Sequence, residues 1–188
     1  MFQIRIHGRG GQGVVSGAEM LSISAFLEGK HAQAFPSFGS ERMGAPVVAF
    51  CRIDDKEIRL REPIMEPDAL IIQDPTLFSA INVFTGFNPD GFLIVNTTRS
   101  FEELGIEEFA SQLPPGNILA VPATELAMKY VRRPVPNVPL LGGFARLTGK
   151  ISLESVKAAI REKFPGPLGE ANISAVCAAY ETSAPLKS

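Results

Sequence analysis

The chain opens with alternating hydrophobic and polar residues and then changes to a helical spacing. Phe2, Ile4 and Ile6 alternate with polar residues, which is typical of a strand with one buried face. From about residue 12 to residue 28, hydrophobic residues recur at steps of three and four, which predicts a helix. Residues 30–35 then form a candidate second strand. The pattern therefore predicts a Rossmann-like βαβ unit at the start of the chain.

Short apolar runs, separated by turn residues or by helical spacings, continue to residue 130. Further strands are expected at 47–53, 57–61, 69–73, 91–96 and 117–121. Helical segments are expected from about residue 76, at 101–110 and at 123–130. Alternating strands and helices predict an α/β fold with three layers and a mostly parallel sheet.

Two of these strands are predicted to form a hairpin with its turn at Asp54 and Asp55. Residues 47–53 are nearly all apolar, whereas residues 57–61 alternate charged and apolar residues. Two adjacent carboxylates also suit a metal site, but no histidine lies nearby in the sequence. The turn is therefore the favoured interpretation.

The last third of the chain has helical spacing throughout. A proline-rich joint spans residues 132–139, and Asn137 is expected to cap the helix that follows. Ser152 is expected to cap the next helix, and the last helix contains residues 173–180. No internal repeat or flexible linker interrupts the pattern, so residues 1–188 are predicted to form a single domain.

A glycine-rich turn joins the first strand to the first helix. Its residues are Gly8, Arg9, Gly10, Gly11, Gln12 and Gly13. Three of the glycines have the G-x-G-x-x-G spacing of a dinucleotide fold, and glycine lets a ligand touch the backbone. The amides at the start of the following helix favour an anion, so this turn is a candidate phosphate site. A tight turn that needs glycine only for packing is the alternative.

The nature of the ligand depends on an acidic residue that NAD sites require. An NAD site has Asp or Glu about 20 residues after the glycines, at the end of the second strand. The candidate strand at 30–35 ends without an acid, and Glu28 lies before it, at the end of the helix. We therefore expect a nucleotide-type ligand other than NAD. Asp74 and Asn96 end later strands and are expected at the same edge of the sheet.

Composition and charge exclude several classes of function. The chain has 188 residues, 45% of them hydrophobic, with a net charge of -2 and a pI near 5.8. No basic surface for nucleic acid is indicated. No apolar run approaches the length of a membrane span and no targeting segment opens the chain, which predicts a cytoplasmic protein.

Few side chains of the kinds that bind metals or carry out catalysis are present. Cys51 and Cys177 lie in apolar sequence and are expected to be buried thiols, and no C-x-x-C motif is present for zinc or an iron-sulfur cluster. His7 and His31 are the two histidines, and neither is paired with a motif for a nucleophile. We therefore predict no catalytic residue and no metal site in this chain, although His7 is placed to contact a ligand of the glycine turn.

Residues 35–46 form a predicted loop of unusual composition. They mix turn residues with Phe38, Met43 and a charged pair, Glu41 and Arg42. Large apolar side chains are poor choices for a loop that faces only water, so we expect an interface with a partner or a ligand. An exposed connection is the alternative.

These motifs together resemble the gamma subunit of 2-oxoacid:ferredoxin oxidoreductases. The resemblance rests on IHGRGGQG at residues 6–13, QAFPSFGSER at 33–42 and GAPV at 44–47. It extends to Pro67-Asp68, Asp74-Pro75, Val95-Asn96-Thr97 and Ser152-Leu153-Glu154, and so covers nearly the whole chain.

The resemblance implies a subunit of an enzyme that oxidatively decarboxylates a 2-oxoacid with coenzyme A, giving acyl-CoA, CO2 and reduced ferredoxin. It also implies thiamine diphosphate and 4Fe-4S clusters in partner subunits, namely alpha, beta and a ferredoxin-like delta. The gamma subunit itself is implied to bind coenzyme A, and the isolated chain is expected to be inactive and free of iron. We expect the coenzyme A site to include Gly8, Arg9, Gly10, Gly11, Gln12, Gly13 and Asn96.

Departures from the family pattern bear on the substrate. Met43 lies where many relatives have a polar or basic residue, and Gln73 replaces the usual apolar residue before Asp74. They point to an aromatic or branched oxoacid, such as phenylglyoxylate, as an alternative to pyruvate. Two other functions stay open: a stand-alone NAD-dependent dehydrogenase, and a scaffold subunit whose glycine turn binds nothing.

Overall fold

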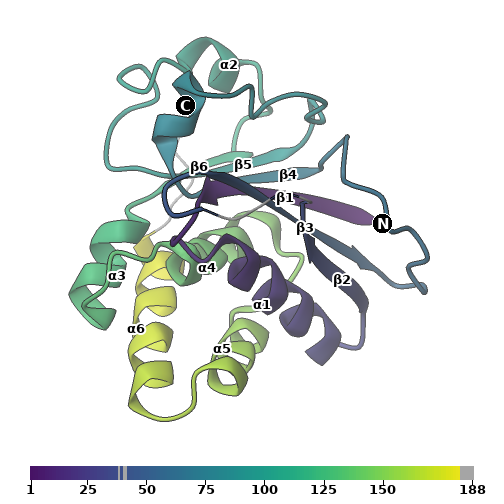
Figure 1. Ribbon diagram of the computed structural model, residues 1–188, viewed down its shortest axis with the longest axis vertical. Helices are drawn as coiled ribbons and strands as arrows, with labels where there is room; N and C mark the ends of the chain where they lie inside the picture. Colours follow the sequence, from purple (N-terminus) through teal and green to yellow (C-terminus); the bar gives the residue numbers. More distant parts are fainter. Residues whose placement is uncertain (38, 40–41, 183–188) are drawn as a thin grey trace.

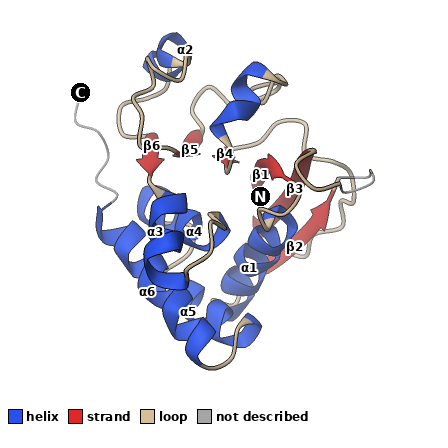
Figure 2. Ribbon diagram, turned by 60° about the vertical axis from the view of Figure 1, so that its left-hand side comes forward, coloured by secondary structure: helices blue, strands red, loops and turns tan. Residues whose placement is uncertain are grey.

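The computed structural model describes residues 1–37, 39 and 42–182 and contains a six-stranded sheet flanked by helices (Figures 1 and 2). The strands are β1 (Phe2–Arg9), β2 (His31–Pro36), β3 (Pro46–Asp54), β4 (Ala69–Ile72), β5 (Phe92–Asn96) and β6 (Ile118–Val121). The helices are α1 (Val14–Leu27), the 3-10 helix η1 (Pro75–Ser79), α2 (Glu107–Ser111), α3 (Ala123–Val131), α4 (Asn137–Thr148), α5 (Leu153–Lys163) and α6 (Pro167–Thr182). The predicted α/β class with a helical last third is confirmed. No helix in the described part of the chain is long and apolar enough to cross a membrane.

The strands are arranged in the order β2-β3-β1-β4-β5-β6. Neighbours are parallel from β1 through β4 and β5 to β6, whereas β3 is antiparallel to both β1 and β2. β1 and β2 therefore run in the same direction, as the βαβ prediction requires, but β3 lies between them. In a dinucleotide-binding fold the second strand lies directly beside the first. The insertion of β3 moves the end of β2 away from the glycine turn.

The direction in which the chain crosses the sheet decides which face each helix covers. From β1 the chain reaches β2 on one side, and later adds β4, β5 and β6 on the other. Because parallel crossovers are right-handed, α1 lies on one face and η1 and α2 lie on the opposite face. Figure 1 shows α1 and α3 to α6 below the sheet and α2 above it. We call these two sides the helical face and the open face.

The helical face holds the main hydrophobic core. Its members include Leu21 of α1, Phe144 of α4 and Val176 of α6, all fully buried. A smaller cluster on the open face contains Leu70 and Val95, whose strands turn alternate residues to opposite faces. Because hydrophobic stabilisation scales with the apolar area removed from water, the helical face contributes most of it.

The predicted strand at 57–61 does not form. β3 is hydrogen-bonded to β1 along one edge and to β2 along the other, so neither edge is free for a following strand. The segment instead contacts β2, where Gln33 Nε2 donates a hydrogen bond of 2.7 Å to the Leu60 carbonyl. The hairpin prediction is wrong because the pairing of β3 with β1 joins residues far apart in the sequence and leaves no local signal.

The predicted helix at 101–110 is replaced by a single turn and the short helix α2. Ser100 and Glu103 form a capping box, in which each side chain accepts a hydrogen bond from the other residue's amide (3.1 and 2.8 Å). Gly105 then adopts a φ of 72°, and Ile106 donates its amide back across the turn (2.9 Å). Gly105 is thus the residue at which the helical spacing is interrupted.

The two cysteines differ in their surroundings. Cys51 on β3 is fully buried, and burial raises the pKa of its thiol to about 12. Cys177 on α6 is only partly buried. The expectation of a buried thiol is therefore confirmed for Cys51 and wrong for Cys177.

Candidate functional site

The carboxyl ends of β1, β4 and β5 meet at one edge of the sheet, as predicted. The glycine turn follows β1, Asp74 follows β4, and Asn96 is the last residue of β5. Gln12 Nε2 donates a hydrogen bond to Asp74 Oδ2 (2.9 Å), and Asn96 Nδ2 donates one to the Gln73 carbonyl (2.8 Å). Parallel α/β sheets bind ligands at this edge. We call it the carboxyl edge.

The glycine turn has a left-handed backbone at two positions. Gly11 has a φ of 93° and Gly13 a φ of 71°. Gly13 is the residue before α1, and a side chain in this conformation costs roughly 1–2 kcal/mol. Gly8 and Gly10 lack a positive φ, so they are glycine for another reason. A Cβ on Gly8 would lie 2.5 Å from Val14 Cγ2, which indicates close packing of the turn against α1.

The space beside two of the glycines is filled by atoms of the chain itself. A Cβ on Gly10 would collide with the carbonyl oxygen of Arg42. A Cβ on Gly11 would lie 2.5 Å from the sulfur of Met43. The Arg42 carbonyl therefore occupies the room beside Gly10, whereas beside Gly11 lies the end of the exposed Met43 side chain. The phosphate contact expected of these two glycines stays a prediction.

Residues 42–45 form a cover over the glycine turn. Gly10 donates its amide to the Ala45 carbonyl (2.9 Å), and Gly44 donates its amide to the Gly10 carbonyl (3.1 Å). Met43 pairs with Gly10 in an isolated bridge. Each contact is between backbone groups, so the cover lies close to the turn only because Gly10 has no side chain.

The predicted interface loop at 35–46 is only partly described. Its two ends belong to β2 and β3, while Phe38, Ser40 and Glu41 lie outside the described residues. The side chain of Met43 is 87% exposed. A role for this loop in an interface stays a prediction.

Arg9 is held by the protein's own groups. Its guanidinium lies 3.3 Å from Asp74 Oδ2 and donates hydrogen bonds to Thr76 Oγ1 (2.9 Å) and to the Gly44 carbonyl (3.0 Å). Burial alone would raise the pKa of Asp74, but hydrogen bonds from Thr76 and Gln12 and the charge of Arg9 outweigh it and lower that pKa. Arg9 therefore positions the turn, the cover and the end of β4, with its charge balanced by Asp74.

Gln12 and Asn96 also use their side chains within the protein. Gln12 Oε1 accepts a hydrogen bond from the Arg9 amide (2.8 Å), which closes the glycine turn. Asn96, 8% exposed, donates to Thr124 Oγ1 (2.8 Å) and accepts from the Thr124 amide (3.2 Å). The predicted site residues therefore gather at the carboxyl edge, where these two side chains make it rigid.

Asn137 is a residue of this site that the sequence reasoning missed. It is the first residue of α4, is 5% exposed, and donates from Nδ2 to the Gly13 carbonyl (3.2 Å). A Cβ on Gly13 would collide with this amide. The prediction that Asn137 caps α4 is wrong, because Pro136 occupies that position and no side-chain cap forms. The sequence feature that could have indicated this role is the single asparagine directly before the apolar run at 138–145.

The start of α1 is a helix end with uncompensated positive potential. No side chain caps it, and no acid lies in its first turn. The start of α4 shares both features, whereas Asp74 caps η1, Ser152 caps α5, and both α2 and α3 have acids in their first turns. Unpaired amides at a helix start stabilise a nearby anion by roughly 0.3–1 kcal/mol. The start of α1 therefore favours an anionic group at the carboxyl edge.

A cavity of about 360 Å³ opens at the carboxyl ends of β5 and β6. Asn96, Thr98, Arg99 and Thr124 are among the residues that line it. Thr98 and Arg99 are exposed there. Its charged lining residues are Arg99 and Glu125, so the cavity offers hydroxyl and guanidinium donors to a polar ligand beside one carboxylate.

His7 is a buried structural residue. It is 5% exposed, and its Nε2 accepts a hydrogen bond from Arg5 Nε (3.0 Å). Burial, together with the charge of Arg5, lowers the pKa of His7 to about 3, so the ring is neutral. The expectation that His7 contacts a ligand of the glycine turn is not supported by this geometry. In the described part of the chain, no three His, Cys, Asp or Glu side chains gather in a way that could hold a metal ion.

Glu28, whose spacing is nearest to that of an NAD-binding acid, acts elsewhere. Its Oε1 accepts hydrogen bonds from the Ser152 amide (2.6 Å) and from Ser155 Oγ (2.7 Å). Burial alone would raise the pKa of Glu28, but these hydrogen bonds and one from Lys30 lower it to about 2. Glu28 therefore joins the end of α1 to the start of α5. With β3 also inserted beside β1, the geometry does not support the alternative of an NAD site.

Comparison with known proteins decides the family. The family model for pyruvate ferredoxin/flavodoxin oxidoreductases matches residues 3–182. The chain belongs to this family. The resemblance to a gamma subunit of these enzymes is confirmed, and the chain is a subunit of a multi-subunit oxidoreductase.

Two relatives show how far the similarity extends. The pyruvate/ketoisovalerate oxidoreductases common subunit gamma of Pyrococcus furiosus is 46% identical over 181 residues, which is 96% of each chain. Pyruvate synthase subunit PorC of Methanosarcina barkeri is 50% identical over 161 residues, covering 86% of this chain and 85% of the relative. The similarity therefore includes both the carboxyl edge and the helical last third.

Solved structures agree with the fold. The pyruvate oxidoreductase subunit PORC of Thermotoga maritima has a TM-score of 0.81 at 37% identity, with 97% of each chain covered. A 2-oxoglutarate:ferredoxin oxidoreductase of Magnetococcus marinus has a TM-score of 0.72 at 17% identity, covering 99% of this chain and 32% of the other. The second comparison shows a shared fold within a longer chain.

Proposed function

We propose that this chain is the gamma subunit of an oxidoreductase that converts a 2-oxoacid and coenzyme A to acyl-CoA and CO2. The electrons released in this reaction pass to ferredoxin or to another acceptor. Relatives that are 46% and 50% identical are named for pyruvate and ketoisovalerate, which supports pyruvate or a branched oxoacid as substrate. They give no support to the aromatic oxoacid that Met43 and Gln73 suggested.

We infer that the redox cofactors belong to partner subunits. A 4Fe-4S cluster takes about four cysteine ligands, whereas this chain has two cysteines, of which Cys51 is buried in the sheet. Thiamine diphosphate and the clusters are assigned to the alpha, beta and ferredoxin-like delta subunits. This chain then contributes coenzyme A binding and assembly.

The uncapped start of α1 is the observation that carries the coenzyme A assignment. Coenzyme A carries phosphate groups, and a helix start without a capping side chain or an acid favours phosphate. The Magnetococcus marinus oxidoreductase, part of which shares this fold, was solved with coenzyme A bound. The helix start supports a phosphate of coenzyme A at the start of α1, whereas the Magnetococcus marinus structure supports only the presence of coenzyme A in an oxidoreductase that contains this fold.

The glycine turn contributes to this site by shaping it. Gly13 leads the chain into α1, so that the helix amides face the carboxyl edge. Arg9 and Gln12 hold the turn against Asp74. Gly8, Gly10 and Gly11 allow the turn to pack against α1 and against residues 42–45. Asn96 lines the neighbouring cavity, into which the rest of the ligand extends.

An acid placed in the first turn of α1 tests this assignment. Ser16, the third residue of α1, is partly exposed. Ser16→Asp puts a negative charge where the phosphate binds, and the same charge suits a helix start, so the variant folds at least as stably as the original chain. In the assembled complex we expect KM for coenzyme A to rise about three- to tenfold, equivalent to roughly 1 kcal/mol.

Ser16→Asn is the matched control, because it has the same shape without the charge. Its KM for coenzyme A should stay near that of the original complex, and both variants should keep their KM for the 2-oxoacid. An unchanged KM for coenzyme A in an assembled Ser16→Asp complex would contradict the site. The chain would then be the scaffold subunit that the sequence left as an alternative.

A further inference from the structure

The open face carries a row of partly exposed aromatic rings. Phe78, Phe84, Phe87 and Phe109 pack on the second core cluster and keep part of their surface in water. The ring centroids lie 5.5 Å apart for Phe78 and Phe84, 3.8 Å for Phe84 and Phe109, and 6.0 Å for Phe87 and Phe109. We call this row the phenylalanine stack. Each ring leaves apolar area that burial against another molecule would remove from water.

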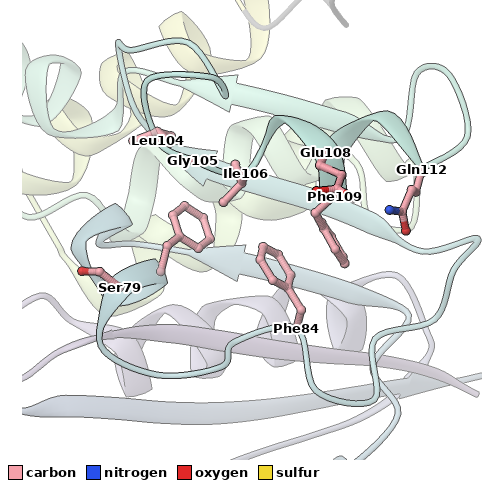
Figure 3. A pocket seen from close by; sticks show the side chains of 9 residues that line it. Ser79, Phe84, Leu104, Gly105, Ile106, Glu108, Phe109 and Gln112 are labelled. Atoms are coloured by element: carbon pink, nitrogen blue, oxygen red, sulfur yellow. The ribbon is translucent and has the colours of Figure 1, made fainter.

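A pocket of about 470 Å³ lies beside the stack (Figure 3). Figure 3 shows the rings of Phe84 and Phe109 close together, with Glu108 and Gln112 on the same helical segment as Phe109. Leu104 is also part of the lining. None of the residues of α2 is buried, so this helix covers the sheet without closing it. The pocket lining combines apolar residues with Ser79, Glu108 and Gln112, and its apolar part suits an inserted apolar side chain.

A large exposed apolar side chain belongs to the segment that packs against the loop carrying Phe84 and Phe87. Gly86, in the loop that carries Phe84 and Phe87, lies so close to the Met65 carbonyl that a Cβ would collide with it. The side chain of Met65 is 67% exposed. Aromatic residues and methionine are enriched in protein interfaces, and large exposed apolar patches on soluble chains mark interaction sites.

Exposed glutamates lie on the segment that carries Phe109, and one of them, Glu108, lines the pocket. Residues 100–116 contain four glutamates and no lysine or arginine. Glu103 is used in the capping box, whereas Glu102, Glu107 and Glu108 are exposed. Glu108 is the charged residue among the described residues that line the pocket, while Glu102 and Glu107 line a neighbouring pocket of about 760 Å³ together with Arg99. An apolar surface beside these exposed glutamates is complementary to a partner that has lysine or arginine around an apolar side chain.

We propose that the phenylalanine stack is a docking surface for another subunit of the oxidoreductase. The partner inserts an apolar side chain into the 470 Å³ pocket and places lysine or arginine residues against Glu107 and Glu108. A partner subunit is the occupant because the chain belongs to a multi-subunit enzyme and because Glu107 and Glu108 carry charge of one sign, which disfavours pairing with the same residues of a second copy. The proposal rests on the subunit role and is independent of where coenzyme A binds.

Charge reversal at Glu107 and Glu108 tests the electrostatic part. Glu107→Lys with Glu108→Lys should lower the affinity of this chain for the remaining subunits about tenfold or more at low salt, with a smaller loss at high salt. Affinity is measured by titrating the separately expressed chain into the other subunits. Glu162→Lys with Glu181→Lys is the matched control, since both residues are exposed on helices of the helical face. This control makes the same change in net charge and should leave affinity unchanged.

Filling the pocket tests the apolar part. Gln112 is exposed and lines the pocket, so Gln112→Trp can place a ring there without disturbing the core. We expect Gln112→Trp to weaken assembly at both low and high salt, and Gln112→Ala to have no effect. Thermal unfolding of each isolated variant checks that the chain still folds.

The outcomes separate this proposal from its alternatives. Normal assembly by both the charge-reversed chain and Gln112→Trp would overturn it. Self-association of the isolated chain that is lost in the same variants would instead assign the surface to a second copy. In complexes that do assemble, KM for coenzyme A should be unchanged by these variants, whereas Ser16→Asp should assemble normally, so the two proposals fail separately.

Discussion

The helical face of the sheet is closed by α1 and α4 to α6, whereas the open face is closed largely by irregular segments that two buried arginines hold in place. On the helical face, Phe144 and its neighbours are fully buried. On the open face, Arg5 is 7% exposed and Arg52 is 2% exposed. Arg5 donates hydrogen bonds to the carbonyls of Val83 (2.8 Å) and Thr85 (2.7 Å). The two faces thus depend on different interactions.

The difference follows from how the backbone amides and carbonyls of each layer find hydrogen-bond partners. A helix pairs most of its own amides and carbonyls, so apolar contacts are sufficient to attach it to a sheet. An irregular segment presents unpaired carbonyls, and a guanidinium with five donors can satisfy several of them. Arg52 does the same for the Glu62 carbonyl (2.6 Å). The open face therefore retains exposed apolar surface, and its stability depends on buried positive charge.

The largest expected difference between the faces is in the cost of losing one aromatic ring. Phe144→Ala should lower the free energy of unfolding by about 3–5 kcal/mol, because the ring is fully buried and leaves a cavity. Phe109→Ala should cost about 1–2 kcal/mol, because its ring is partly exposed beside an existing pocket. Urea denaturation of the isolated chain measures both. Equal losses would show that the open face is packed as tightly as the helical face.

The next effect concerns the guanidinium that holds the open face. Arg5→Met should cost about 2–3 kcal/mol, because the carbonyls of Ile64, Val83 and Thr85 lose their donor. Burial lowers the pKa of Arg5, which means that keeping its guanidinium charged inside the folded protein costs free energy. Arg5→Lys keeps the charge with fewer donors and should recover part of the loss. If Arg5→Met is as stable as the original chain, apolar packing alone holds these segments.

Two further effects are in the response to acid, and they differ in pH range. The pKa of His7 falls from 6.5 to about 3 on folding, so its contribution to stability is complete above pH 6.5 and is lost as pH falls toward 3. The pKa of Glu28 falls from 4.5 to about 2, so its contribution is complete above pH 4.5 and is lost as pH falls toward 2. For Glu28 we expect about 1 kcal/mol, since it is partly exposed to solvent.

Single variants separate the two pH ranges. His7→Gln keeps an acceptor for Arg5 and should flatten the dependence of unfolding free energy on pH below 6.5. Glu28→Gln should flatten it only below pH 4.5. Unfolding free energy is measured by urea denaturation at a series of pH values. A His7→Gln chain that keeps the full dependence between pH 6.5 and 4.5 would show that other groups cause it.

Most strands could be predicted from the sequence because their signal is local. The apolar patterns placed all six strands within about two residues, and Ser152 caps α5 as expected. The predicted helix at 101–110 failed at Gly105, which has a left-handed backbone. The strand at 57–61 failed because both edges of β3 are occupied.

The sequence predicted where the residues of the candidate site lie, but it did not predict which residues they contact. The sequence indicated that the glycine turn, Asp74 and Asn96 lie at one edge, and they do. It did not indicate that Arg42 and Met43 fill the space beside Gly10 and Gly11. These contacts join residues more than thirty positions apart, and single-sequence patterns carry no information on such pairs.

The sequence by itself determined the family, the α/β alternation and the strand-to-helix turn, because each depends on residues that are neighbours along the chain. Only the tertiary structure decided why the turn needs its glycines. Gly13 packs against Asn137, which lies 124 residues later, and Gly10 packs against the backbone of the 42–45 segment. A position in the chain can require glycine for several reasons: a ligand that lies against the backbone, a left-handed turn or another chain segment that crosses close by. Which reason applies depends on the atoms that the fold brings into the space that a side chain would occupy.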